Sequence, residues 1–393
     1  MITLILKILV GLFLLAAICI FAVDGFFWLL DRYCRFHIGR WPDPQEWEEA
    51  VCRVARKWAR KTPTVKITDN SRYMLLDMLN GRYRSQSIQS WQTAAVILGL
   101  LEKGELETAG STASRFLNSS GNWRKVPVAA DSSMLAYAIL KAAENPQKVK
   151  PAMDFMIALI ERNIDKNGTI AYTNSADPNR YVDTLGLVCP FLALYANTYG
   201  CPEYEVLACN QLRFYHDRGL LTGCALPNHA IHVQTKLPLG VYGWGRGVAW
   251  YVIGLVDTYA SLTDQALKRE VLGWIREAAE AYRPFQRQDG GFGSILQIST
   301  SYDSSATAAL AWFYGHCARL LQCEAYAACA DRCLAKLRGV TRITGKIDWC
   351  QGDTKGIGIF AQTYDIMPFA QGFALRAINL QNKEHSYDAK DQN

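Results

Sequence analysis

The stretch Gly240–Tyr259, GVYGWGRGVAWYVIGLVDTY, joins a glycine-rich, aromatic segment to an ordinary apolar helix pattern. Its first eleven residues hold four glycines, two tryptophans and one arginine. Glycine lets a backbone approach a ligand closely, whereas indoles offer stacking faces and a guanidinium binds carboxylates. The stretch therefore predicts a helix whose entrance faces a ligand.

The same design recurs along the chain. Turns that contain a polar residue and a glycine precede a short irregular stretch and then a pattern with apolar residues three and four apart, which is typical of helices. These patterns start near Ser87, Ala130, Asp183, Gly247, Ser304 and Met367. Each can be paired with a second helix, and the partners start near Pro44, Leu106, Lys148, Pro202, Thr263 and Glu324.

Six such pairs predict an all-α fold, the (α/α)6 toroid, in which an inner ring of helices is wrapped by an outer ring. The helices assigned to the inner ring are the more apolar, as a buried ring requires. No linker divides the chain into two ordinary domains. We expect a membrane anchor in residues 1–30, a juxtamembrane linker in 31–44, the toroid in 45–382 and a polar tail in 383–393.

The N-terminus has the composition of a transmembrane helix. The apolar run from Ile2 to Val23 is interrupted only at Thr3, Lys7 and Gly11. Because about 20 apolar residues suffice to span a bilayer, we expect contact with the lipid bilayer through residues 2–30.

The anchor is expected to remain uncleaved. A signal peptide needs a small-residue cleavage site behind a shorter apolar core, and bulky Ile18 before Cys19 argues against lipoprotein processing. Arg32, Arg35 and Arg40 follow the segment, whereas its front carries only Lys7 and the amino terminus. Because positive charge is retained on the cytoplasmic side, we expect a single-pass protein with a cytoplasmic body.

The remaining composition argues against several classes of site. The net charge of +6 is spread along the chain, which does not support nucleic-acid binding. The twelve cysteines include no Cys-x-x-Cys pair, and several lie in apolar helical patterns where a reduced thiol packs as a small hydrophobe. Metal-ligand spacing, a phosphate-binding glycine loop and a nucleophile elbow are not found. We therefore expect no metal and no cofactor.

All inner helices of a toroid run the same way, so the segments before them meet at one mouth. These segments are SWQ at 90–92, ADS at 130–132, YVD at 181–183, WGR at 244–246, YDS at 302–304 and YD at 364–365. Aromatic faces beside carboxylates suit a sugar, and a guanidinium suits an acidic one. The candidate substrate-binding residues are Trp91, Tyr181, Trp244, Arg246 and Trp250, with His229 and His232 in the loop ahead of Trp244. For each aromatic residue, packing in the core is the alternative.

Asp131 and Asp183 occupy equivalent positions in successive units, 52 residues apart. Either can act as a helix N-cap. Two carboxylates that face each other across a pocket would instead repel, which raises one pKa and separates acid from base roles. For Asp303 and Asp365, at two later entrances, we expect capping.

Four motifs in order resemble those of glycoside hydrolase families 88 and 105. They are YVDTLGLVCPFLA from Tyr181, WGRGVAW from Trp244, SSATA from Ser304 and MPFAQ from Met367. The likeness spans roughly residues 45 to 382. It implies an unsaturated glucuronyl or rhamnogalacturonyl hydrolase on an (α/α)6 barrel, which hydrates the C4=C5 double bond of an unsaturated uronic acid. By this resemblance Asp183 is the catalytic aspartate and Asp131 the second one, and the binding positions are Trp91, Trp244, Arg246 and Trp250.

The chain departs from the family pattern at Val248, where asparagine is usual, and at Tyr181, where tryptophan is usual. A family histidine after the Gly219 turn is missing from its place unless His229 or His232 replaces it. Two functions therefore stay open. The first is a membrane-anchored hydrolase of unsaturated uronyl, hence acidic, oligosaccharides. The second is a non-hydrolytic glycan-binding or assembly protein in membrane-associated polysaccharide biosynthesis.

Overall fold

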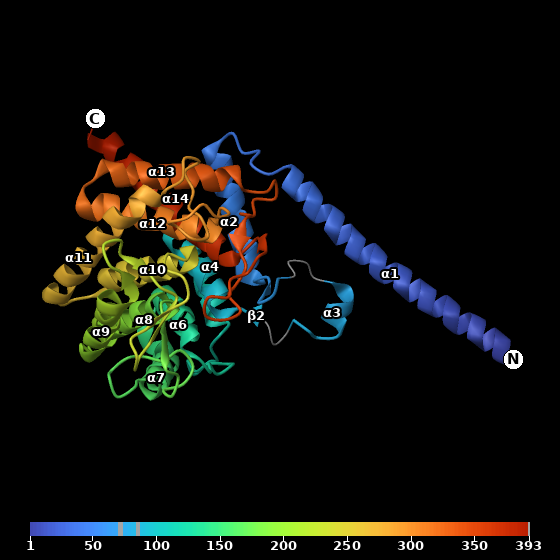
Figure 1. The fold of residues 1–393 in the computed structure, drawn as a ribbon, viewed down its shortest axis with the longest axis horizontal. Helices are drawn as coiled ribbons and strands as arrows, with labels where there is room; N and C mark the ends of the chain where they lie inside the picture. Colours follow the sequence, from blue (N-terminus) through green and yellow to red (C-terminus); the bar gives the residue numbers. More distant parts are fainter. Residues whose placement is uncertain (70–73, 84–86, 392–393) are drawn as a thin grey trace.

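Helices form most of the regular structure. The computed structural model describes residues 1–69, 74–83 and 87–391. Within these ranges, twelve helices form a closed ring of two layers, and a long N-terminal helix projects from the ring (Figure 1). The predicted all-α toroid is confirmed.

The two layers of the ring follow the predicted pairing. The inner helices are α4 (Ser90–Lys103), α6 (Ser133–Ala142), α8 (Asp183–Tyr199), α10 (Gly245–Ser261), α12 (Ser304–Leu321) and α14 (Pro368–Asp391). The outer helices are α2 (Pro44–Arg60), α5 (Leu106–Ser114), α7 (Pro146–Arg162), α9 (Glu203–Gly219), α11 (Gln265–Tyr282) and α13 (Glu324–Gly339). Every helix starts within three residues of the position expected from the sequence.

Short strands and turns build the loops around the ring. A three-stranded antiparallel sheet contains β3 (Asn179–Tyr181), β6 (Ala230–His232) and β7 (Pro238–Leu239). The two-stranded pairs are β1 (Val65–Lys66) with β2 (Ser87–Ile88), β4 (Leu220–Leu221) with β5 (Leu226–Pro227), and β8 (Cys350–Gln351) with β9 (Tyr364–Asp365). A five-residue helix, α3 (Leu75–Leu79), lies between β1 and β2 in the chain.

Neighbouring inner helices meet at glycines. Helix α14 packs against both α12 and α4, which closes the ring. A Cβ on Gly372 of α14 would lie 2.1 Å from the carbonyl oxygen of Ala95, and one on Gly99 would lie 2.6 Å from that of Gly372. Between α8 and α10, a Cβ on Gly186 would lie 2.6 Å from the carbonyl oxygen of Trp250. Since real side chains do not approach backbone so closely, these glycines allow the ring its narrow radius.

A buried arginine links the inner helices at the end away from their entrances. Arg376 of α14 donates two hydrogen bonds to Asp257 of α10, at 2.7 and 2.9 Å. It also binds Glu102 of α4 at 2.7 Å and lies 4.1 Å from the ring centroid of Trp312 on α12. Four of the six inner helices are therefore joined through one guanidinium, which is fully buried.

We expect the substitution Arg376→Met to lower the free energy of unfolding by about 3–5 kcal/mol, because it leaves Asp257 without its buried partner. Denaturant unfolding of the full chain in detergent, followed by circular dichroism, measures this loss. The control is Arg213→Met, which breaks the half-exposed pair with Glu270 and should cost less than about 1 kcal/mol. Equal losses in the two variants would contradict a special role for Arg376.

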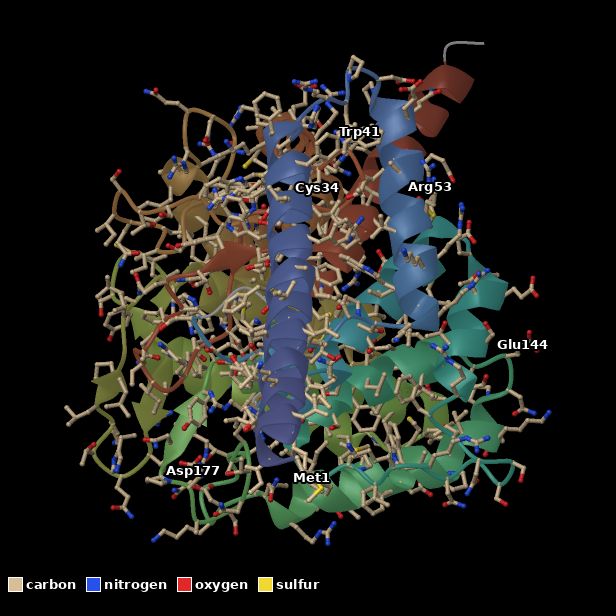
Figure 2. The ribbon with its side chains drawn as sticks, turned by 90° about the vertical axis from the view of Figure 1, so that its right-hand side faces the viewer. Met1, Cys34, Trp41, Arg53, Glu144 and Asp177 are labelled. Atoms are coloured by element: carbon tan, nitrogen blue, oxygen red, sulfur yellow. The ribbon has the colours of Figure 1, made fainter. Side chains whose placement is uncertain are left out.

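The N-terminal helix α1 (Ile2–Phe36) is long and apolar enough to cross a membrane. Figure 2 shows it as a rod in front of the ring, with Met1 and Cys34 labelled near its two ends. Its first part is largely exposed, whereas Cys34 is buried against the body. The helix continues past residue 30, so part of the expected linker is helical. Helix α14 likewise extends into the expected tail, of which residues 392–393 lie outside the described ranges.

Charged residues fasten the last turns of α1 to the ring. Arg342 binds Asp31 of α1 at 2.8 Å, and it also binds Asp348 at 2.7 Å and Asp365 at 3.0 Å. Arg35 of α1 binds the same Asp348 at 3.1 Å. Because Asp348 is fully buried, this network orients α1 against the loops that follow α13.

Candidate active site

The loops that enter the inner helices are bonded to one another. The backbone amides of Ala130, Val182, Gly245 and Ser304 donate to the carbonyl oxygens of Tyr172, His229, Ser294 and Trp349, respectively, at 2.8–3.2 Å. Each of these bonds joins the start of one inner helix to a loop from elsewhere in the chain. Together with the bond from the amide of Phe369 on α14 to Gln92 of α4, at 2.9 Å, these contacts join the entrances into one rim.

Asp183 is the first residue of α8 and lies inside this rim. Its side chain is 19% exposed, yet its Oδ2 atom is buried and has no hydrogen-bond partner among the described residues. Burial and then the charge of Asp353 raise the pKa of Asp183 to about 7, although Arg246 acts in the opposite direction. A carboxyl group in this state carries a proton near neutral pH and can give it away.

Asp353 lies close enough to both Asp183 and Asp131 for its charge to act on them. Burial raises the pKa of Asp131 and of Asp353, and the charge of Asp353 adds to the effect on Asp131. Burial also raises the pKa of Tyr172 well above its ordinary value, with contributions from the charges of all three aspartates. The structure thus brings Asp131 and Asp183 into one group of acids, and Asp353 is a third member that the sequence did not indicate.

His229 faces Asp183 from the loop before β6. The distance between Nε2 of His229 and Oδ2 of Asp183 is 3.9 Å. The Nδ1 atom of His229 accepts a hydrogen bond from the amide of Gly358, so the proton is on Nε2, toward Asp183. Burial, followed by the charge of Arg246, lowers the pKa of His229 to about 4. The imidazole is therefore a neutral donor at pH 7, close to the buried oxygen.

Arg246 of α10 is turned into the protein and not toward open space. It donates to the carbonyl oxygens of Gln351 and Gly352 at 2.7 Å each and forms an ion pair with Asp353 at 3.3 Å. The side chain is fully buried. Its positive charge still lowers the pKa of Asp183, against the larger effect of burial. The direct effect of Arg246 is to hold the loop that carries Asp353.

The three candidate indoles are buried as well. Trp244 packs its ring against His229, with centroids 4.7 Å apart, and donates from Nε1 to Gln351 at 3.2 Å. Trp91 and Trp250 contact each other edge to face at 5.2 Å, beneath the entrances. Core packing, the alternative for these residues, is what the structure contains. They form the floor of the mouth and present little open stacking surface.

Tyr181 and His232 have different surroundings. Tyr181 is half-buried and contacts Tyr172 and His229 with ring centroids 5.6 and 6.1 Å apart, so it belongs to the mouth. His232 lies at the far end of β6, and its Nδ1 atom bonds to Thr235. Among the described residues, no contact joins His232 to the three aspartates.

The two aspartates expected to act as caps behave differently. Asp303 accepts from the amide of Ser305 at 2.9 Å, so its role as the N-cap of α12 is confirmed. Asp365 does not cap α14. It lies on β9 and binds Arg342, as described above. The expectation for Asp365 was wrong because the chain makes a strand there and enters the last inner helix later.

Asp353 and Tyr172 were not predicted as site residues. Asp353 follows β8 in a loop rich in glycine, QGDTKGIGIF from Gln351, as is the entrance around Trp244. That likeness was the available signal. Tyr172 comes from a loop between an outer and an inner helix and has no distinguishing pattern.

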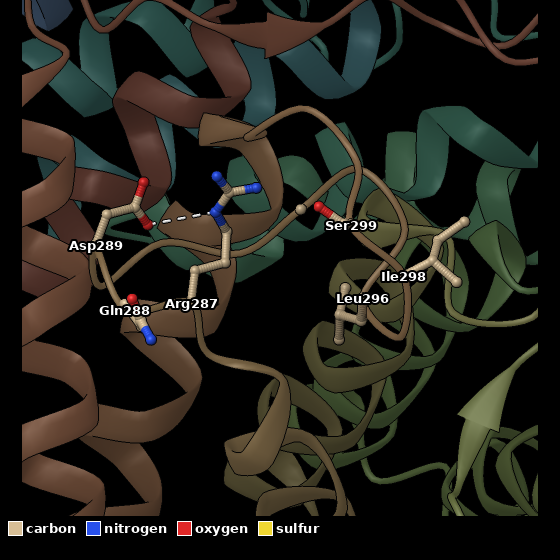
Figure 3. A pocket seen from close by; sticks show the side chains of 7 residues that line it. Arg287, Gln288, Asp289, Leu296, Ile298 and Ser299 are labelled. Atoms are coloured by element: carbon tan, nitrogen blue, oxygen red, sulfur yellow. Dashed lines mark ion pairs between the residues drawn. The ribbon is translucent and has the colours of Figure 1, made fainter.

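A separate cavity of about 440 Å³ lies in the loop before α12. Figure 3 shows its lining, with Arg287 and Asp289 on one side and Leu296, Ile298 and Ser299 on the other. Arg287 pairs with Asp289 at 3.4 Å. The lining contains none of the three aspartates of the mouth, so this cavity is not the site of their chemistry.

An (α/α)6 ring with acids at its mouth defines a glycosidase-like protein. Residues 96–350 match the model of Glycosyl Hydrolase Family 88, which is more than half of the chain. The chain belongs to this family. No curated protein matches it.

Several solved structures share this fold. A possible member of glycoside hydrolase family 105 from Klebsiella pneumoniae is 14% identical with a TM-score of 0.70, covering 88% of this chain and 95% of its own. An unsaturated glucuronyl hydrolase specific for heparin is 15% identical with a TM-score of 0.65, covering 87% and 98%. An unsaturated glucuronyl hydrolase from Bacillus sp. GL1, responsible for the degradation of glycosaminoglycan, is 16% identical with a TM-score of 0.59, covering 84% and 94%.

The raised pKa of Asp183 makes a prediction about stability. Between about pH 4 and about pH 7 this carboxyl group ionises in the unfolded chain but keeps its proton in the folded one. The free energy of unfolding therefore falls as the pH rises through this range. We expect Asp183→Asn to increase the free energy of unfolding by about 2–4 kcal/mol at pH 8 and to have little effect at pH 4. Thermal unfolding at a series of pH values measures the difference. The control is Asp331→Asn on the exposed face of α13; a gain that does not depend on pH would contradict the raised pKa.

Proposed function

We propose that this protein is a membrane-anchored hydrolase that acts on unsaturated uronyl oligosaccharides. The observation that carries the proposal is the burial of Asp183 in a mouth that holds two further acids, which raises its pKa to about 7. Hydration of an enol ether begins with protonation of carbon, and this step requires a positioned acid.

In the proposed reaction, Asp183 gives its proton to C4 of the unsaturated uronic acid. The resulting carboxylate accepts a proton from water, whose oxygen bonds to C5. The hemiketal at C5 opens to a ketone, and the neighbouring sugar leaves from C1. One water molecule is consumed, and the carboxyl group of Asp183 is protonated again at the end.

The neighbours of Asp183 have supporting roles in this scheme. Asp353 keeps the pKa of Asp183 high by its negative charge. His229 is neutral and points Nε2–H toward Asp183, so it stabilises the carboxylate once the proton has left. Asp131 lies in the same group of acids and orients the sugar or the water. Arg246 positions Asp353 through the loop at Gly352.

The anchor is the second part of the proposal. Helix α1 carries an apolar run of sufficient length, and its last turns are bound to the body through Asp31 and Arg35. This attachment supports an uncleaved helix that holds the ring beside the membrane. The arginines behind the apolar run favour a cytoplasmic body.

A non-hydrolytic, glycan-binding or assembly protein is the second candidate function. Two features favour it: the apolar anchor would keep the ring at a membrane, and Tyr181 and Val248 depart from the hydrolase pattern. Such a protein would bind acidic glycans beside membrane polysaccharide enzymes without converting them.

Hydrolysis predicts loss of ultraviolet absorbance when the full chain in detergent meets unsaturated glucuronyl disaccharides, because hydration removes the C4=C5 bond. The rate should fall as the pH rises through about 7, since the protonated form of Asp183 is then lost. Asp183→Asn should lower the rate roughly 10²–10⁴-fold. The control Asp331→Asn should leave it unchanged.

Binding of acidic glycans without any loss of absorbance would contradict hydrolysis and support the second candidate function. A rate that is the same for Asp183→Asn and the wild type would contradict the role of Asp183.

The side of the membrane is tested by C-terminal fusions to alkaline phosphatase and to green fluorescent protein. We expect fluorescence and no phosphatase activity, because the arginines behind the anchor are retained in the cytoplasm. Exchanging them, with Arg32→Glu and Arg40→Glu, should weaken this orientation. Phosphatase activity of the unaltered chain would contradict the cytoplasmic body.

A further inference from the structure

A second cavity, of about 560 Å³, lies between α1 and the rim of the ring. Its lining is mostly apolar and comes from four parts of the chain. These contribute Phe27, Trp28 and Leu30 of α1; Val65, Met74 and Met78 around β1 and α3; Arg342, Lys346 and Gly352 in the loops after α13; and Thr363, Ile366 and Pro368 before α14. Its volume falls within the range of small-molecule binding sites. We call it the anchor pocket.

The anchor pocket begins where the apolar run of α1 ends. Asp24 follows that run, and its Oδ1 atom accepts a hydrogen bond from the amide of Leu75 at the start of α3, at 2.9 Å. Helix α3 exposes Leu76, Met78 and Leu79, each at least half exposed. Apolar residues on α1 and α3 thus lie side by side at the level expected for the membrane surface. Phe27, Trp28, Leu30 and Met78 line the pocket and are each at least 40% exposed, so the apolar surface of α1 and α3 continues into the pocket.

The anchor pocket also adjoins the acids of the mouth. Gly352 lines the pocket, and the next residue is Asp353. On the neighbouring wall Pro368 lines the pocket, and the next residue, Phe369, packs against Trp91 on the floor of the mouth at 5.5 Å. The segments at Gly352 and Pro368 therefore border both the anchor pocket and the mouth.

The charged groups of the lining differ in their partners. Arg342 is bound by three aspartates, as described above. Lys346 also lines the pocket, and no ion pair is found for it within the described ranges. It is half-buried. A lysine in this position suits an anionic group at the polar end of a lipid.

We propose that the substrate is a glycolipid, whose acyl chain occupies the anchor pocket while its acidic sugar enters the mouth of the ring. This inference rests on the proposed function and names the class of its substrate. The anchor then brings the ring to its substrate, since it holds the ring at the membrane in which such a lipid resides. As in the reaction described above, the bond from C1 to the leaving oxygen breaks last. The group that leaves from C1 carries the lipid.

Photo-crosslinking in phosphatidylcholine vesicles tests occupancy of the anchor pocket without any need for catalysis. The probe is a glucuronosyl diacylglycerol with a diazirine in one acyl chain, added to the full chain, and peptides are mapped by mass spectrometry. We expect adducts in residues 27–34, 63–68 and 363–368. Val65→Trp and Thr363→Trp fill the pocket and should abolish these adducts, whereas the control Ile298→Trp, at the other cavity, should retain them.

Two outcomes would overturn the proposal. Adducts confined to residues 2–23 would mean that the chain meets lipid only in the bilayer. Equal pocket labelling by phosphatidylcholine that carries the same diazirine would mean that the pocket takes bulk lipid and does not select a glycolipid.

A kinetic comparison separates this inference from the proposed function. Val65→Trp and Thr363→Trp should lose turnover of an unsaturated glucuronosyl diacylglycerol in vesicles and keep turnover of the water-soluble unsaturated disaccharide. Loss of neither activity would overturn the glycolipid proposal alone. Absence of both activities in the wild type would contradict hydrolysis, and the crosslinking result would then still decide whether the pocket binds a glycolipid.

Discussion

The pairing of Arg376 with Asp257 and Glu102 is the interaction on which the ring depends. Because the guanidinium is buried, loss of Arg376 or of its acidic partner leaves an unpaired buried charge. Such a change lowers the free energy of unfolding. By joining α14 to α4 and α10, it fixes the far end of the inner ring. The glycine contacts between α4 and α14 act with it, because they allow the first and last inner helices to close the circle. Once the far ends are fixed, the starts of the helices have defined places, and the entrance loops can bond to one another.

The site follows from that geometry and from exclusion of water. The entrances bring Asp131, Asp183 and Asp353 into one enclosed region, where burial disfavours their ionised forms. Trp91, Trp244 and Trp250 close the floor, so they contribute to the site by removing solvent from below it. The charge of Arg246 offsets part of the cost of burying an ionised aspartate. Its side chain also holds the loop that carries Asp353. The pKa of Asp183 therefore depends on all of these residues of the mouth together.

The fold was predictable because each hairpin repeats a local pattern. Helical spacing and polar-glycine turns are readable in the sequence, and the starts of helices such as α8 and α12 were predicted to the residue. Asp183 was predictable in the same way, since it begins a helix in a recognisable motif. The partners of Arg246 and the burial of the indoles were not, because they depend on loops more than 50 residues away in the chain. Asp365 was assigned to a cap because the sequence does not show that the chain forms β9 there and that Arg342 binds it.

The most direct test of this account is an infrared titration of the carboxyl groups in the full chain, comparing the wild type with Asp183→Asn. The account predicts a protonated carboxyl band that disappears with a midpoint at about pH 7 in the wild type and is absent from the variant. It further predicts that Asp353→Asn lowers the midpoint, because the charge of Asp353 helps to hold the proton. A band of Asp183 that titrates at about pH 4, the ordinary value for an exposed aspartate, would contradict the account.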